Sequence, residues 1–149
     1  MVTIKTGNLL YAKETIIAHQ VNCCGVAAGL AAAVFKKWPY AKKNYMDLTS
    51  RLNGKILLGM AYYTGMQKDG HIIANLFGQL EPGADYRPDR LEQALAQLAA
   101  FAKIGNWSVA LPWRISCGIC GGDWDEVQQI IERTMDGVDC VIYRRKGDE

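Results

Sequence analysis

Hydrophobic periodicity divides the chain into alternating strand-like and helix-like segments. Short runs of β-branched and apolar residues predict buried strands, and apolar residues three or four positions apart predict amphipathic helices. The predicted strands are residues 2–5, 15–21, 55–64, 71–77, 107–112 and 138–143. The predicted helices are residues 27–38, a segment that begins at Pro39 and is stopped by Asn53-Gly54, residues 88–103 and residues 123–135.

The order of these elements predicts the fold class. Strands alternate with helices through most of the chain, which is typical of an α/β protein whose mixed, largely parallel sheet carries helices on both faces. A polar turn at residues 67–70 separates two predicted strands, so residues 55–64 and 71–77 are expected to form a hairpin. A chain of 149 residues without repeats or a linker fits one domain, residues 1–149.

Two loops carry the clearest functional signal. The first loop (residues 19–30) and the second loop (residues 112–124) each follow a predicted strand, lead toward a predicted helix and are rich in Gly and small residues. Such loops let backbone N–H groups approach a phosphate, with the helix dipole behind them. Because ligands of parallel sheets bind beyond the carboxyl ends of the strands, the two loops are expected to hold one ligand with more than one phosphate between them.

Composition narrows the classes of partner. Half of the residues are hydrophobic, 21% are charged and the net charge is +2, so neither disorder nor direct nucleic-acid binding is expected. No apolar run is long enough to span a bilayer, and the N-terminal residues show no signal-peptide pattern. We therefore expect a cytoplasmic protein without a membrane partner.

The five cysteines leave a metal or redox function as a third possibility. Adjacent Cys23 and Cys24 fit a zinc site poorly, because neighbours in a strand point to opposite sides. Cys117 and Cys120 form only one C-x-x-C pair, although a lowered thiol pKa at Cys120, just before a helix, is an alternative. We expect free thiols, no metal and no cofactor.

Four segments resemble the macrodomain family in the family's own order. Residues 6–10 (TGNLL) resemble its opening segment, residues 22–31 its first ligand loop, residues 73–79 its central strand and residues 117–124 its second ligand loop. The resemblance implies a three-layer α/β/α macrodomain that binds ADP-ribose. The subgroup it resembles processes ADP-ribose 1″-phosphate in phage, bacteria and yeast. This implies a hydrolase acting on that phosphate or on an ADP-ribosyl adduct, possible partners among ADP-ribosylated macromolecules, and, as the alternative, a non-enzymatic ADP-ribose reader.

The resemblance also assigns ligand-binding residues. It implies that Asn8 lies near the adenine and that Tyr143 or its neighbours flank it. The residues implied to face the distal ribose and a phosphate are Asn22, Gly25, Val26, Ala28 and Gly29, and those implied to cradle the pyrophosphate are Ser116, Cys117, Gly118, Ile119 and Cys120. The first loop is one residue shorter than the usual pattern. Arg114 replaces a usually small or apolar residue, and it either pairs with a phosphate or points into solvent.

Three residues are candidates for catalysis: His19, Asn22 and Asp123. His19 precedes Asn22 by three positions, as in the yeast member of the subgroup, and its ring is expected near the mouth of the pocket; the alternative is a core histidine. Asp123 is alternatively an N-cap. The related glycohydrolase branch, which uses a Lys after the central strand, is disfavoured because residues 75–90 contain no Lys and Cys120 replaces the Asp of its second motif.

Overall fold

A six-stranded sheet runs through the computed structural model, which describes residues 1–148. The strands lie in the order β1-β6-β5-β2-β4-β3, and every neighbouring pair is parallel except β3 and β4. Their bounds are β1 Val2–Thr6, β2 Ile16–Asn22, β3 Ala61–Tyr63, β4 Ile72–Gln79, β5 Val109–Pro112 and β6 Cys140–Arg144. The mixed, largely parallel sheet expected from the alternation of elements is confirmed.

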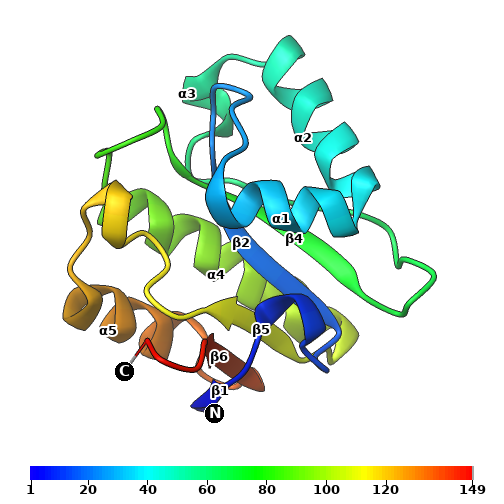
Figure 1. Cartoon of the computed structure of the whole chain (residues 1–149), viewed down its shortest axis with the longest axis vertical. Helices are drawn as coiled ribbons and strands as arrows, with labels where there is room; N and C mark the ends of the chain where they lie inside the picture. Colours follow the sequence, from blue (N-terminus) through cyan, green and yellow to red (C-terminus); the bar gives the residue numbers. More distant parts are fainter. Residues whose placement is uncertain (149) are drawn as a thin grey trace.

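Helices cover both faces of this sheet (Figure 1). The α-helices are α1 Gly29–Lys37, α2 Pro39–Arg51, α3 Gly54–Leu57, α4 Pro88–Gly105 and α5 Trp124–Thr134, and two 3₁₀ turns are η1 Leu9–Tyr11 and η2 Gly118–Cys120. One hydrophobic cluster joins α4 and α5 to one face of the sheet, and a second joins α1 and α2 to the other. The result is the predicted three-layer α/β/α arrangement.

The central strands are apolar on both faces because they lie between the two helical layers. In β2, Ile16 and Ala18 belong to the cluster under α4 and α5, whereas Ile17 and Val21 belong to the cluster under α1 and α2. The same period of two divides the side chains of β4. Both strands are therefore anchored from both sides, and the loops that leave them start from well-packed positions.

The predicted strand over residues 55–64 is wrong in its first half. Asn53 caps a short helix there, because its side chain accepts a hydrogen bond from the backbone N–H of Lys55 at 2.8 Å. A short apolar run is compatible with either a strand or a helix, and the Asn53 cap stabilises the helix α3. The remainder forms β3, which pairs antiparallel with β4, so the predicted hairpin is confirmed.

The strand order brings several chain segments to one edge of the sheet. Because β2, β5 and β6 are parallel, the first loop, the second loop and the segment after β6 all leave from the same edge. The turn η1, which follows β1, lies beside them. Among residues 1–148, no helix combines the length and the apolar character needed to cross a membrane.

Candidate functional site

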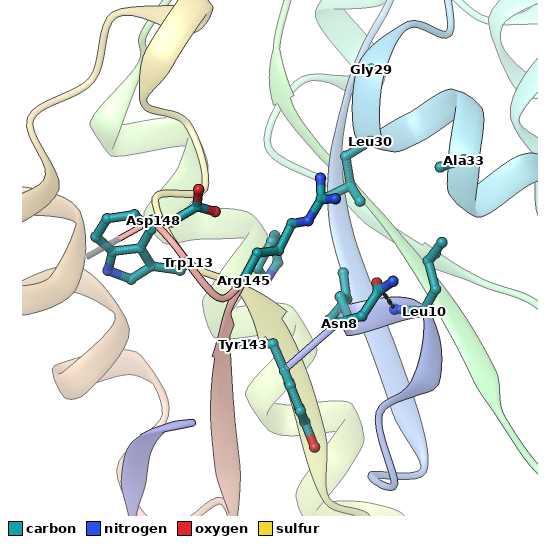
Figure 2. Close-up of a pocket in the computed structure, with 11 residues that line it drawn as sticks. Asn8, Leu10, Gly29, Leu30, Ala33, Trp113, Tyr143, Arg145 and Asp148 are labelled. Carbon is teal, nitrogen blue, oxygen red and sulfur yellow. Dashed lines mark hydrogen bonds between the residues drawn. The ribbon is translucent and has the colours of Figure 1, made fainter. Parts of the chain in front are cut away.

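A row of connected cavities follows this edge of the sheet. The first cavity, of about 480 Å³, lies between η1, the start of α1 and the ends of β5 and β6 (Figure 2). The second cavity, of about 310 Å³, lies between the first and second loops, and the third, of about 300 Å³, follows the second loop. Leu30 lines all three cavities, and Gly29 lines the first two, so the cavities form one groove.

The first cavity is mainly apolar with a few polar groups. Leu10, Leu30 and Trp113 contribute apolar walls, and Asn8 lies at its base. The Asn8 side-chain oxygen accepts a hydrogen bond from the backbone N–H of Leu10 at 3.0 Å, which caps η1. The two amide hydrogens of Asn8 have no partner among the described residues and remain available to a ligand.

Tyr143 lines the first cavity. Its hydroxyl donates a hydrogen bond to Glu14 at 2.6 Å, and Figure 2 shows the side chain directed away from Asn8 and Leu30. The Tyr143 hydroxyl is therefore engaged outside the cavity.

Asn22 closes the first loop. Its side-chain oxygen accepts hydrogen bonds from Cys24 N–H at 2.9 Å and from the Tyr45 hydroxyl at 2.8 Å, and its amide nitrogen donates to the Val26 carbonyl at 2.8 Å. A shift in the β2–β4 register between Gln20 and Asn22 accompanies this arrangement. The extra residue of this shift lies on β4, and Asn22 reaches Tyr45 in α2 while it also lines the second cavity.

Gln20 holds the second loop, and sequence reasoning missed it. Its side-chain oxygen accepts a short hydrogen bond from the Ser116 hydroxyl, and its amide nitrogen donates to the Cys120 sulfur at 3.7 Å. A Cβ at Gly78 on the neighbouring strand would overlap this amide. The available signal was a polar amide between His19 and Asn22 at the end of a buried strand that begins with apolar residues.

The second loop holds two non-glycine residues in the left-handed region. The φ angles are 61° at Arg114 and 67° at Ser116. Such conformations cost roughly 1 kcal/mol each and cluster at ligand sites. Arg114 lines the third cavity and a further cavity of about 360 Å³, where it lies beside Trp113 and Gly118. The left-handed backbone thus occurs in the loop predicted to hold phosphate.

His19 does not point toward the groove, contrary to expectation. Its side chain is 0% exposed, its ring packs edge-on against Phe35, and it lines none of the cavities described above. Its Nε2 donates to the Asn75 side-chain oxygen at 2.6 Å, and Asn75 in turn donates to the Ala41 carbonyl at 3.1 Å. Burial lowers the pKa of His19 to about 4, against the raising effect of the Asn75 hydrogen bond. The alternative of a neutral core histidine fits these contacts.

Asp123 is the N-cap of α5, as the alternative interpretation held. Its side chain accepts a hydrogen bond from the Asp125 N–H at 3.1 Å, and it lines none of the described cavities. Gly25 likewise stays outside the cavity walls and forms a turn at φ 78°, where an added Cβ would lie 3.0 Å from the Thr49 hydroxyl. Neither residue contacts the groove directly.

The remaining predicted residues are brought together. Asn8, Gly29 and Tyr143 line the first cavity, and Ser116 lines the third. The second cavity has Asn22, Val26, Ala28, Gly29, Cys117, Ile119 and Cys120 in its wall, and Gly118 lies at the fourth. Trp113, Arg145 and Asp148 also line the groove.

The described cysteines are all free. Burial raises the pKa of the Cys117 thiol and raises that of Cys23 to about 11, so both are neutral thiols near pH 7. Within residues 1–148, no three His, Cys, Asp or Glu side chains gather closely enough to hold a metal ion.

Comparisons with known proteins identify the family to which this fold belongs. The family model described as Macro domain matches residues 18–131, and the chain belongs to this family. Among solved structures, the macrodomain of Mycobacterium tuberculosis DarG is 28% identical with a TM-score of 0.85, over 96% of this chain and 97% of that one. The macrodomain of Thermus aquaticus DarG is 26% identical with a TM-score of 0.82, over 97% and 98%.

A third structure, Thermosipho africanus DarTG in complex with ADP-ribose, shares the fold at 18% identity and a TM-score of 0.83, over 99% of this chain and 42% of that one. No curated protein shows a significant sequence match to this chain.

The buried His19 predicts a specific pH dependence of stability. Its pKa is lower in the folded protein, about 4, than in the unfolded chain, 6.5, so protons bind preferentially to the unfolded state and stability falls as pH drops through this window. His19→Gln keeps a donor for Asn75 but cannot ionise. Between pH 7 and 4.5, urea unfolding should show that the wild type loses about 2 kcal/mol more than this variant. Equal losses would contradict the burial of a neutral ring.

The cap at Asp123 predicts a stability change with an internal control. Asp123→Ala should lower the free energy of unfolding by about 1 kcal/mol, because the Asp125 N–H loses its acceptor. Asp123→Asn retains a side-chain oxygen and should stay within about 0.5 kcal/mol of the wild type. Thermal and denaturant unfolding of both variants measure this difference; equal destabilisation by Ala and Asn would argue against capping.

Proposed function

We propose that this protein binds ADP-ribose, or a derivative with the same diphosphate core, along the groove and acts as a reader of ADP-ribosylated macromolecules. The observation that carries the proposal is the sequence of cavities: a cavity with apolar and aromatic residues at one end, the start of α1 facing the second loop in the middle, and a second cavity with three side-chain amides in its wall. A nucleoside diphosphate sugar has the same order of chemical groups.

The first cavity suits the nucleoside. Apolar and aromatic walls with a few polar groups are typical of small-molecule sites. Leu10, Leu30 and Trp113 can enclose a base, the ring of Tyr143 adds an aromatic wall, and the free amide hydrogens of Asn8 can donate to a ring nitrogen. The Thermosipho africanus relative was solved in complex with ADP-ribose, which supports a ligand of this class.

The start of α1 suits a phosphate. Ala28 is its N-cap residue and provides no side-chain cap, so the first N–H groups of this helix lack a side-chain acceptor. Such N–H groups, with the helix dipole behind them, bind anions. Gly29 lies at this point in the wall of two cavities, and the second loop faces it across the third. A diphosphate in this position would receive backbone donors from both loops.

The second cavity suits the distal ribose. Its walls include the amides of Asn22, Gln20 and Gln79, which can bond sugar hydroxyls. Its described walls contain no His, Lys, Asp or Glu side chain. Its titratable side chains are the thiols of Cys117 and Cys120, so neither an imidazole, an amine nor a carboxylate stands ready as a general acid or base for hydrolysis at the distal ribose.

Hydrolysis of ADP-ribose 1″-phosphate or of an ADP-ribosyl adduct is the second candidate function. The resemblance to phosphate-processing macrodomains favours it, and the four polar contacts that immobilise Asn22 could let this amide orient a water molecule. The residues that line the groove favour the reader function over hydrolysis, because neither His19 nor Asp123 lines the second cavity.

Calorimetry with a ligand series should separate the parts of the groove. ADP-ribose should bind at least about tenfold more tightly than adenosine, since charge-assisted and backbone hydrogen bonds to the diphosphate each contribute about 1 kcal/mol or more. ADP should lie between them. A phosphate-release assay on ADP-ribose 1″-phosphate should show no turnover. Equal affinity for ADP-ribose and adenosine would refute the diphosphate assignment, and multiple turnovers would favour the hydrolase.

Gly29→Glu should abolish ADP-ribose binding while the fold persists. No atom lies within 4 Å of an added Cβ at Gly29, so the side chain would extend into the groove and bring a negative charge to the phosphate position. The left-handed φ of 54° adds strain, which Gly70→Glu matches at φ 88° on a turn with equally open space outside the groove. The Gly70 variant should keep wild-type affinity. Retained affinity in a folded Gly29→Glu protein would remove α1 from the site.

A further inference from the structure

We propose that Arg145, in the segment after β6, is a diphosphate-binding residue that adds a side-chain cation to the backbone donors of the two loops. This inference rests on the proposed function and identifies a part of the site that the family match does not cover, since that match ends at residue 131.

The position of Arg145 carries the inference. Its side chain lines the first cavity, and Figure 2 shows it leaving the end of β6 and reaching toward Leu30 at the start of α1. Leu30 is the residue common to the first, second and third cavities. The guanidinium of Arg145 therefore lies near the junction where a ligand spanning the groove would place its phosphates.

Arg145 has no acidic partner within 4 Å among residues 1–148. The described ion pairs use four other arginines, at positions 51, 87, 90 and 133. One carboxylate, that of Asp148, lines the same cavity without reaching ion-pair distance. An exposed arginine ordinarily finds either a carboxylate or open solvent, whereas this one extends over a cavity.

The base of the segment is held in place by packing. The guanidinium of Arg144 lies 5.6 Å from the centre of the Trp113 ring, and its Nε is buried without a hydrogen-bond partner in the described part of the chain. The backbone N–H of Trp113 also donates to the Tyr143 carbonyl at 2.9 Å. Because Trp113 itself lines the groove, Arg145 begins from a point fixed relative to the cavity wall.

The chemistry favours a diphosphate over a nucleobase. A guanidinium donates two parallel hydrogen bonds to phosphate oxygens, and charge-assisted bonds of this kind are stronger than neutral ones. Backbone N–H groups supply only partial charges. A full positive charge at the junction would offset the repulsion that Asp148 exerts on an anionic ligand.

The test compares Arg145→Gln with Lys146→Gln, an exposed cation at the next position that lines none of the described cavities. Calorimetry should show ADP-ribose affinity reduced about tenfold by Arg145→Gln and unchanged by Lys146→Gln. Affinity for adenosine, which has no phosphate, should be the same in all three proteins. The ADP-ribose affinity of the Arg145 variant should also depend less on salt than that of the wild type.

A second variant tests whether the negative charge of Asp148 opposes the binding of an anionic ligand. Asp148→Asn removes the nearby negative charge and should tighten ADP-ribose binding about threefold, because exposed charges at such distances interact by about 1 kcal/mol or less. Weaker binding would show that Asp148 itself contacts the ligand and would overturn the assignment of this segment to the diphosphate.

Each remaining outcome also decides the matter. An equal loss of adenosine and ADP-ribose affinity in Arg145→Gln would mean that Arg145 stacks on the base, and no loss would mean that it faces solvent; both overturn the inference while leaving ADP-ribose binding intact. A wild-type protein that fails to bind ADP-ribose would refute the proposed function and, with it, this role for Arg145.

Discussion

The end of β2 determines how the whole edge of the sheet is organised. Consecutive side chains of a strand point to opposite faces, so His19 enters the layer of α1 and α2 while Gln20 reaches the second loop. At the end of the strand, the Asn22 amide closes the first loop against Tyr45. Three neighbouring residues thus secure a helical layer and both loops, and the groove lies between the loops they hold.

The fold and the two loops could be predicted because their signals are local. Apolar periodicity identifies buried strands and helices, and small residues after a strand identify close-approach loops wherever the rest of the chain lies. The face of the sheet on which a buried strand residue lies is not determined by the local sequence. His19 was expected near the pocket from its spacing to Asn22, yet period-two alternation across β2 places it beside Phe35. Gln20 and Arg145 were missed because only strand order shows which segments meet at the groove.

The groove combines a second cavity without charged side chains in its described wall with charge concentrated near the chain terminus. The walls of the second cavity offer side-chain amides and thiols, whereas arginines gather around Trp113, at 5.6 Å and 5.7 Å from its ring centre for Arg144 and Arg114. The charged groups and the second cavity therefore occupy different parts of the groove.

The left-handed backbone at Arg114 and Ser116 has a consequence for how this family member can change over time. Glycine and, to a lesser degree, asparagine adopt that conformation with little strain. Substitution by either at position 114 would therefore relax the loop at no cost in backbone shape, and drift should favour it unless the arginine side chain is under selection. Retention of an arginine at this strained position in related proteins would indicate selection for its positive charge. The residue found at position 114 would then report whether ligand binding constrains this loop.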